Sequence, residues 1–563
     1  MAKRKRRFGK VAAAGAMPPA GPAWAGRLWK LLTAHPIRVC SVLVLVASAR
    51  IVATYVVFNH TIDEPAHIAC GLEWLQKHTY TLEPQHPPLA RIASAIGPYL
   101  DGARLPNTFS IYHAGAVALY SAEDYGRRLA LSRLGILPFF WLASAFVFLW
   151  ARRSGGNGLA ILAVFLFTSL PAVLAHAGLA TTDMAPTAFT IGAFYAALVF
   201  AERPGFRSGL LLGILSALAV LSKFSALAFV PVTVGAMAVV HLAVERPGVR
   251  ALLSHIRRWV LPLAAAAVVA ALMVWAAYRF SFGPAHFKTP NWASLRVPAP
   301  EFFQGIGDAQ AHLDKGHPAY LLGQRSQTGW WYYYFVLLAV KTPVAFLLLL
   351  AIGMFVWLRR VPKFWPPVVF TAALLVFSAF NRINIGLRHL LPVYGGLSLL
   401  AAFGALECVR GRRRWAVVTG AVLLAWAGLA SVLAHPDYLA YMNEFTGDAP
   451  EQILADSDLD WGQDMNRLGR RLQEVGATRV SFAPFILADY ARHGLPPVTP
   501  SHPQYPASGW NAVSITVWKV TRLGLYDEHP EVRLWPDLVR RQERVGKSML
   551  LYYFPPASPP GGG

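Results

Sequence analysis

The strongest constraint on the fold is a series of apolar segments, each close to the twenty residues that cross a bilayer as a helix. Within the bilayer a backbone has to satisfy its own hydrogen bonds, which a helix does. The segments lie at residues 39–58, 129–151, 159–176, 184–201, 208–222, 225–243, 259–279, 342–358, 364–380, 390–409 and 415–434. We therefore expect an all-α polytopic membrane protein with about eleven transmembrane helices.

Composition supports this class and argues against a nucleic-acid partner. The chain of 563 residues is 55% hydrophobic and only 14% charged, which is too apolar for a soluble enzyme of this length. The formal net charge is +23, but Lys and Arg fall mainly in short clusters between apolar segments, where they orient spans. Cys40, Cys70 and Cys408 show no metal-ligand spacing, so we expect neither a disulfide framework nor a zinc site.

The basic clusters predict which ends of the spans face the cytoplasm. With the N-terminus inside, five clusters fall on the same side, as the positive-inside rule requires. They are Arg152-Arg153, Arg203 with Arg207, Arg246 to Arg258, Arg359-Arg360 with Lys363, and Arg410 to Arg414. We expect a multi-pass protein of the plasma (inner) membrane with its N-terminus cytoplasmic and its C-terminus extracytoplasmic.

The N-terminal residues 1–37 predict a basic, disordered cytoplasmic tail. A cleaved signal peptide is the competing interpretation, because Ala47-Ser48-Ala49 resembles a cleavage site. The long charged region before it, and the apolar run that continues past Arg50 to Phe58, favour the tail.

Three long segments are then left outside the membrane. Two are loops of the transmembrane domain (residues 38–434), at 59–128 and 280–341. The third is residues 435–554, where apolar or alternating runs surround a helical stretch and predict a small α/β domain. The last residues, 555–563, are rich in Pro and Gly and predict a disordered tail.

Asp63 and Glu64 directly follow the first span and are the first candidates for catalysis. Acidic groups beside a bilayer are costly unless they are solvated or paired. A carboxylate such as Asp63 can act as a general base when it lies within hydrogen-bond reach of a hydroxyl. The structural alternative is a helix N-cap at Asp63, with Pro65 early in the first turn, and both interpretations can hold together.

A second signal is a set of basic side chains at the outer ends of spans, where the positive-inside rule predicts few. They are Lys223, Lys341, Arg382, Arg388 and His389. Each alone is explained by snorkelling to headgroups. Together they predict a site for an anion such as a lipid phosphate, for which Arg offers a forked donor and Lys a point charge.

Weaker candidates lie in the outer segments. His86 stands in the Pro-rich sequence Gln85-His86-Pro87-Pro88, and Asp183 precedes a span, where a helix cap is the ordinary role. Residues 456–464 form an acidic run whose spacing resembles a calcium loop, but the glycine and the distal glutamate of an EF-hand are misplaced. Asp183, Asp458, Asp460 and Trp461 are expected to contact the acceptor or to support the site.

The order of these motifs resembles one family over roughly residues 38–470. The matching motifs are Asp63-Glu64, His86-Pro87-Pro88-Leu89, Thr182-Asp183, Leu221-Ser222-Lys223, Lys341-Thr342-Pro343, Gly386-Leu387-Arg388-His389 and Asp458 to Asp464. They are similar to those of the GT-C polyprenyl-phosphate-sugar-dependent glycosyltransferases of the family 39 type, the protein O-mannosyltransferase and lipid A aminoarabinose transferase group. Shared order and sidedness make the set more specific than any single motif.

The resemblance implies a membrane glycosyltransferase whose donor is a polyprenyl-phosphate-linked sugar. Asp63, with Glu64 beside it, would position or deprotonate the acceptor, while the outer basic groups and His86 would hold the donor phosphate. A single displacement would invert the anomeric configuration, and preorganised cations would stabilise the charge that grows on the leaving phosphate. The partners implied are the lipid-linked donor, membrane lipid and an acceptor that is a protein, a lipid or a glycan.

One departure from the family concerns the metal. Some relatives place an acid and a lysine before the proline of the first-loop motif, where this chain has Gln85 and His86. We therefore assign no metal ligands and no required cofactor, and leave a divalent metal as an alternative. The competing functions are a transporter or lipid flippase, whose paired repeats around a midplane site are not found here, and a binding protein.

Overall fold

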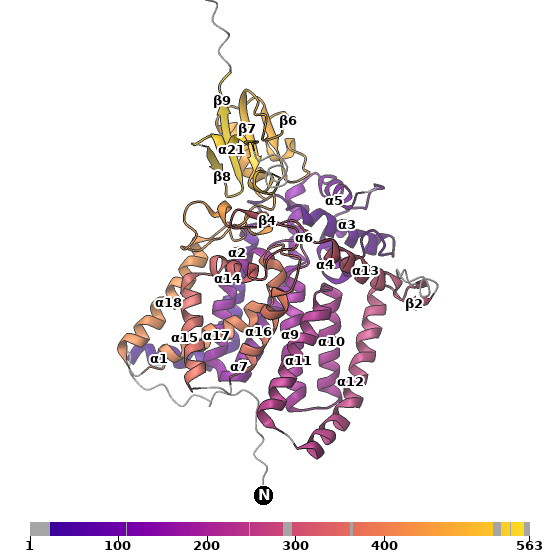
Figure 1. The fold of residues 1–563 in the computed structure, drawn as a ribbon, viewed down its shortest axis with the longest axis vertical. Helices are drawn as coiled ribbons and strands as arrows, with labels where there is room; N and C mark the ends of the chain where they lie inside the picture. Colours follow the sequence, from indigo (N-terminus) through magenta and orange to yellow (C-terminus); the bar gives the residue numbers. More distant parts are fainter. Residues whose placement is uncertain are drawn as a thin grey trace, which may run out of the picture.

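The computed structural model describes residues 23–556 except 109, 247, 285–294, 361–363, 412, 522–530 and 541. Long helices form a bundle, a layer of shorter helices and loops lies above it, and a small sheet stands at the top (Figure 1). The predicted terminal tails lie mostly outside the described residues. Residues 23–34 differ from that prediction and form helix α1 (Ala23–Ala34), because Trp29 packs against Gly158 of the bundle.

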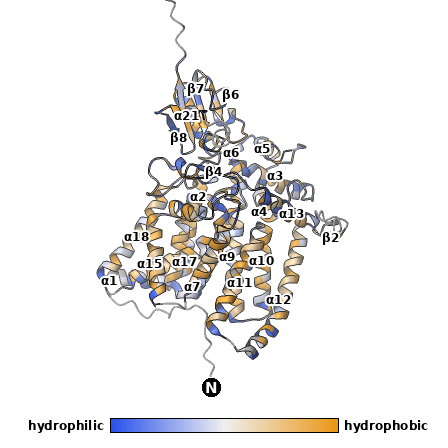
Figure 2. Ribbon diagram, in the orientation of Figure 1, coloured by the Kyte–Doolittle hydropathy of each residue, from blue (hydrophilic) through white to orange (hydrophobic). Residues whose placement is uncertain are grey.

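Apolar helices build the bundle, and most of the ribbon along these helices has the colour of hydrophobic residues (Figure 2). They are α2 (Pro36–Ala53), α7 (Leu137–Thr168), α8 (Pro171–Ala177), α9 (Met184–Glu202), α10 (Phe206–Ser222), α11 (Ala226–Glu245), α12 (Val249–Ala277), α14 (Tyr333–Lys341), α15 (Val344–Arg360), α16 (Pro366–Ala379), α17 (Val393–Val409) and α18 (Arg414–Leu433). Among the described residues, six helices are long and apolar enough to cross a membrane, or seven if the bent pair α14–α15 is one span. Helices α10, α16 and α17 are apolar but shorter. The predicted class, an all-α membrane bundle followed by a small sheet, is confirmed.

Two predicted spans have different ends in the structure. The first ends at Ala53 rather than at residue 58, and the apolar residues that follow form turns. The segment predicted at 159–176 breaks between α7 and α8, since Pro171 at the start of α8 lacks the amide that a continuous helix needs. Within α7, Gly156 has φ 84° and separates the two apolar halves that were predicted as individual spans.

The outer layer consists mainly of the two predicted loops. Its elements are α3 (Asp63–Gln76), α4 (Pro88–Leu100), α5 (Ile111–Tyr120), α6 (Tyr125–Leu134), α13 (Pro300–Lys315), β1 (Phe282–Pro284), β2 (Arg296–Pro298), β3 (Ala319–Leu321) and β4 (Gln324–Ser326). Strands β1–β2 and β3–β4 form two antiparallel pairs. Helix α5 lies directly on the start of α3, where a Cβ on Gly115 would stand 1.8 Å from the carbonyl oxygen of Pro65. This close approach fixes the helix that begins at Asp63.

The C-terminal segment folds around a five-stranded sheet in the order β6-β5-β7-β9-β8. Its elements are η3 (Pro450–Gln452), η4 (Asp456–Asp458), α19 (Met465–Glu474), β5 (Val480–Ala483), η5 (Ala491–His493), β6 (Val498–Pro500), β7 (Gly509–Ser514), η6 (Val517–Thr521), α21 (Trp535–Leu538), β8 (Glu543–Val545) and β9 (Met549–Phe554). Strand β5 is parallel to β6 and β7, while β9 is antiparallel to β7 and β8. Leu468 and Leu472 of α19 pack with sheet residues such as Phe482. These elements form the α/β structure that the sequence predicts.

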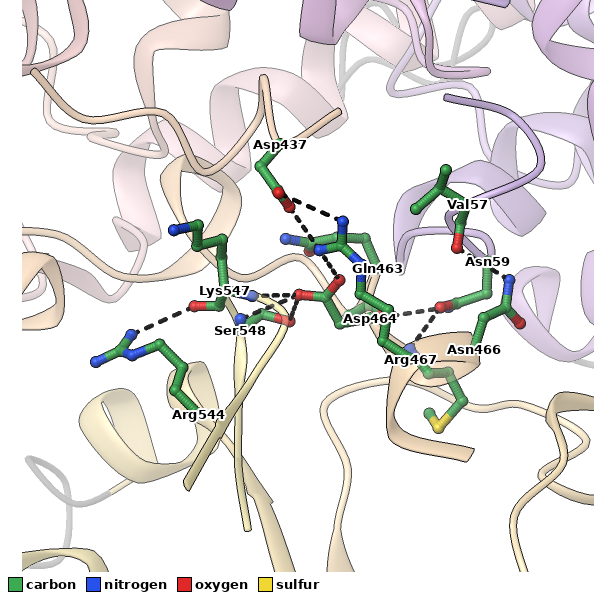
Figure 3. Close-up of polar contacts among 12 residues, drawn as sticks. Val57, Asn59, Asp437, Gln463, Asp464, Asn466, Arg467, Arg544, Lys547 and Ser548 are labelled. Carbon is green, nitrogen blue, oxygen red and sulfur yellow. Dashed lines mark hydrogen bonds and ion pairs between the residues drawn. The ribbon is translucent and has the colours of Figure 1, made fainter. Parts of the chain in front are cut away.

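Asp464 joins this sheet to the segment before α3 (Figure 3). Its buried carboxylate accepts hydrogen bonds from the amides of Lys547 and Ser548 at 2.9 and 3.1 Å and pairs with Arg467 at 3.0 Å. The next amide, that of Met465, donates to the side chain of Asn59 at 2.7 Å. The acidic run therefore holds the chain that leads into Asp63.

Candidate active site

Asp63 and Arg388 form an ion pair at the top of the bundle, between the first residue of α3 and the short helix η2 (Leu387–Leu390). Nη1 of Arg388 donates to Oδ2 of Asp63 at 2.7 Å. The Asp63 side chain keeps 23% of its surface exposed. Asp63 is not an N-cap in the structure, because Ile62 holds that position and no side-chain cap is formed. Its carboxylate is directed to Arg388 instead.

Three residues hold the turn that carries Arg388. The amide of Gly386 donates to the hydroxyl of Tyr333 at 2.9 Å, and the amide of Leu387 donates to Oδ1 of Asp458 at 3.0 Å. The guanidinium lies over the ring of Trp461 at 4.4 Å, where a cation is attracted to the π face. The carbonyl of Trp461 accepts the amide of Ile62 at 3.1 Å. The acidic run thus positions both members of the Asp63–Arg388 pair.

Lys223 and Asp183 form a second acid–cation pair. Nζ of Lys223 donates to Oδ1 of Asp183 at 2.7 Å, and Thr181 donates to its other oxygen at 3.1 Å. Asp183 stands at the N-cap position of α9 but makes no capping hydrogen bond. The ring of His176 lies 3.9 Å from Asp183 and packs edge-on against Trp461. Both pairs are therefore grouped around Trp461.

His86 and His389 also belong to this region. Nδ1 of His86 lies 3.4 Å from Glu83, and its ring is 5.5 Å from that of His67. Burial and the charges of Lys223 and Arg388 hold the pKa of His389 well below its ordinary value. Burial also lowers the pKa of His86. Both imidazoles are thus neutral hydrogen-bonding groups beside the two acid–cation pairs.

Lys341, Asp458 and Asp460 make structural contacts. Lys341 is buried and donates to the carbonyl oxygens of Leu439 and Asp458, at 2.7 and 2.5 Å. Asp460 accepts the amides of Thr516 and Gly462 at 2.7 and 3.0 Å. Their positions connect the acidic run to α14 and to the sheet.

Glu64 is fully buried and paired with Arg133. Nε and Nη2 of Arg133 donate to its two oxygens at 2.8 and 2.9 Å, and the amides of Thr61 and Ala180 donate at 2.7 and 2.8 Å. Four donors saturate this carboxylate. Glu64 therefore links α3 to α6 and to the start of α9 and does not face the Asp63–Arg388 pair.

Arg382 is separated from the other basic residues. Its side chain is exposed, and within the described parts of the chain it makes no hydrogen bond or ion pair. The structure brings together Asp63, Asp183, Lys223, Arg388, His86, His389 and Trp461, with Lys341 and Asp458 bordering them.

The sequence reasoning missed His176, Arg133 and Asp456. His176 ends the apolar segment 159–176, and Arg133 lies within the apolar segment 129–151, so each had a signal as a polar group in an apolar setting. Asp456 opens the acidic run that was noted for a different reason. The position of the Asp456 side chain depends on a turn with a positive φ at this residue, which the sequence does not reveal.

A metal site does not fit the residues around Gln85 and His86. Across the described residues, no group of three or more His, Cys, Asp or Glu side chains has an arrangement that could hold a metal ion. Gln85 is instead bonded to His312 at 3.1 Å, and Glu83 is paired with Arg91.

These features define a polytopic membrane enzyme with a site of paired acids and cations at one end of its bundle. The family model of the dolichyl-phosphate-mannose-protein mannosyltransferases matches residues 41–289, which include Asp63, His86, Asp183 and Lys223. The chain is therefore a membrane glycosyltransferase with a GT-C fold, in agreement with the resemblance in the sequence.

Solved structures with a similar fold have low sequence identity. ArnT from Cupriavidus metallidurans in the apo state is 12% identical, with 91% of this chain and 97% of that chain covered and a TM-score of 0.49. The same protein bound to undecaprenyl phosphate is 13% identical, with 91% of this chain and 97% of that chain covered and a TM-score of 0.48. An Archaeoglobus fulgidus oligosaccharyltransferase tethered with an acceptor peptide is 11% identical, with 88% of this chain and 73% of that chain covered and a TM-score of 0.48. No curated protein matches the sequence.

Proposed function

We propose that the protein transfers a sugar from a polyprenyl-phosphate-linked donor to an acceptor on the extracytoplasmic face, with inversion at the anomeric carbon. The observation that carries the proposal is the ion pair of Asp63 with Arg388 at 2.7 Å, which joins a candidate base to a candidate phosphate ligand 325 residues away. The N-terminal basic residues and the basic clusters support a cytoplasmic N-terminus, with this site and the sheet on the opposite side.

Asp63 serves as the general base in this mechanism. It accepts the proton of an acceptor hydroxyl as that oxygen attacks the anomeric carbon. The bond between the anomeric carbon and the phosphate oxygen breaks, and its electron pair leaves with the polyprenyl phosphate. A protein, a lipid or a glycan can supply the hydroxyl.

Arg388 and Lys223 stabilise the leaving phosphate. Fixed cations in a site that excludes water favour the charge that develops in the transition state. Both cations already hold a carboxylate, so the donor phosphate has to share them with Asp63 and Asp183. When the phosphate occupies Arg388, the carboxylate of Asp63 loses the hydrogen bond from that arginine and is free to accept the proton of the acceptor hydroxyl.

The test is donor consumption by the purified protein. The protein is incubated in detergent with undecaprenyl-phosphate mannose, glucose, galactose or 4-amino-4-deoxyarabinose, each together with a hydroxyl-bearing peptide, lipid or glycan as acceptor. Mass spectrometry follows loss of each donor. We expect one donor to be consumed, and Asp63→Asn to abolish its consumption. Asp489→Asn is the control, because that acid is exposed and lies away from the site. Full activity of Asp63→Asn would remove Asp63 from the mechanism.

A further inference from the structure

Asp456 is a half-buried residue near the Asp63–Arg388 pair. It begins η4, which lies against the turn of Arg388: a Cβ on Gly386 would stand 2.4 Å from Oγ of Ser457. The charge of Asp456 acts on both Arg388 and Asp63. The carboxylate of Asp456 therefore lies near the pair that carries the proposed function.

The carboxylate of Asp456 differs from those of its neighbours in the acidic run. Asp458 accepts the amide of Leu387, and Asp460 accepts two amides and the hydroxyl of Ser514. Apart from the adjacent amide of Ser457, the described residues offer Asp456 no hydrogen-bond donor, and its side chain is partly exposed. Its oxygens are thus free to bind a substrate group.

The backbone of Asp456 holds this carboxylate in place. Its φ of 56° is in the left-handed region, which a residue other than glycine adopts at a cost. The conformation is fixed from both sides: the amide of Asp456 donates to Thr516 at 3.0 Å, and its carbonyl accepts the amides of Leu459 and Asp460 at 2.9 and 2.8 Å. Such strained positions concentrate at functional sites.

We propose that Asp456 binds hydroxyl groups of the transferred sugar beside Asp63. A carboxylate repels the donor phosphate and does not bind the apolar polyprenyl chain, so the sugar hydroxyls are the donor groups that it can bind. The sugar is attached to the phosphate that Arg388 would hold. The hydroxyls of the sugar would therefore lie close to Asp456, which is near the same arginine. Burial raises the pKa of Asp456 to about 6, and the carboxylate form still prevails at neutral pH.

This inference rests on the proposed function and is tested with the donor that the wild-type protein consumes. Asp456→Asn removes the charge but keeps the size of the side chain and tolerates a positive φ. We expect kcat/KM for the donor to fall about 10- to 100-fold, the loss that follows removal of a hydrogen bond to a charged group. Monodeoxy analogues of the sugar identify the hydroxyl: one analogue should lower wild-type kcat/KM similarly and cause no further loss in Asp456→Asn.

Two further measurements separate this role from others. Binding of undecaprenyl phosphate, which carries no sugar, should be no weaker in Asp456→Asn than in wild type, because the variant removes a negative charge that repels phosphate. Asp456→Gly removes the carboxylate and relaxes the backbone, so it should lose the same activity without loss of thermal stability.

Each of three outcomes would overturn the assignment. They are an unchanged donor kcat/KM in Asp456→Asn, losses that are additive between this variant and every deoxy analogue, and a change only in the KM of the acceptor. If the wild type consumes no donor, the proposed function fails and the assignment of Asp456 fails with it. Wild-type turnover with an unaffected Asp456→Asn variant contradicts the assignment alone.

Discussion

Asp63 and Glu64 are neighbours in the chain, and each is paired with an arginine, but their surroundings differ. Glu64 is fully buried with four donors around its carboxylate, whereas Asp63 is 23% exposed and, among the described residues, receives a side-chain hydrogen bond from Arg388 only. A saturated buried carboxylate cannot take up a proton without losing several hydrogen bonds. The Glu64–Arg133 pair therefore stabilises the outer layer, while the Asp63–Arg388 pair is available for chemistry.

The largest expected effect comes from Asp63→Asn. The amide keeps the shape of the side chain but cannot accept the proton of the acceptor hydroxyl, so turnover should fall at least 100- to 10,000-fold, a range typical of general bases. Because Asp63 is partly exposed, thermal unfolding in detergent should stay close to that of wild type. A large loss of stability in this variant would mean that the Asp63–Arg388 pair, like the Glu64–Arg133 pair, has a structural role.

Glu64→Gln should mainly lower the stability of the protein, whereas Asp63→Asn should mainly lower its turnover. Removing one charge of a buried pair leaves Arg133 uncompensated, which typically costs about 3–5 kcal/mol. The same loss is expected for Glu64→Leu and for Arg133→Leu, and the double variant with both leucines should be more stable than the sum of these two single changes. Denaturation of the purified variants in detergent measures these differences. Strict additivity would contradict a direct structural role of the pair.

Much of the fold was predictable because apolar length is a local property. The spans follow from composition over about twenty residues, and the tail strands follow from short apolar or alternating runs. The different fates of Asp63 and Glu64 do not follow from local sequence, since each depends on a partner from a distant segment: Arg388 for one, Arg133 for the other.

The same limit applies to the basic residues of the outer turn. Arg382 and Arg388 look equivalent in sequence, because Arg382 lies within the segment Asn381 to Gly386 at the end of a span and Arg388 lies two residues after it. Only the folded turn directs Arg388 to Asp63 and Trp461 and leaves Arg382 exposed. Asp456 was missed for a related reason: its free carboxylate depends on a positive φ and on contacts with the sheet.

Arg388→Ala and Arg382→Ala form a matched pair from this turn. Loss of Arg388 removes a charge-assisted contact with the donor phosphate, so kcat/KM for the donor should fall about 10- to 150-fold. Arg382→Ala should stay within about 2-fold of wild type, because an exposed arginine contributes little to a site that it does not contact. Donor titrations with both variants measure the difference. Equal losses would indicate a diffuse attraction of the donor rather than a phosphate ligand at Arg388.

The last expected effect concerns pH. His60 and His493 connect the first outer segment, residues 59–128, to the C-terminal sheet. His60 is hydrogen-bonded to the hydroxyl of Tyr125 at 2.7 Å and to the carbonyl of Leu487 at 3.0 Å. His493 bonds Tyr120 and Asn466, each at 2.6 Å. Burial lowers the pKa of both histidines to about 4, so each is neutral in the folded protein at neutral pH.

Acid should therefore weaken the attachment of the sheet. The ordinary pKa of histidine is 6.5, so between pH 6.5 and 4 the unfolded chain binds protons that the folded chain does not. The stabilisation is fully present above pH 6.5 and falls as pH decreases toward 4, by about 2 kcal/mol per histidine at pH 5.

Thermal unfolding at pH 7 and 5 measures the loss, which should be smaller in the double variant His60→Gln with His493→Gln. His78→Gln is the matched control, because His78 is exposed and its replacement should leave the pH dependence unchanged. The same pH dependence in the double variant and in wild type would show that other groups titrate in this range.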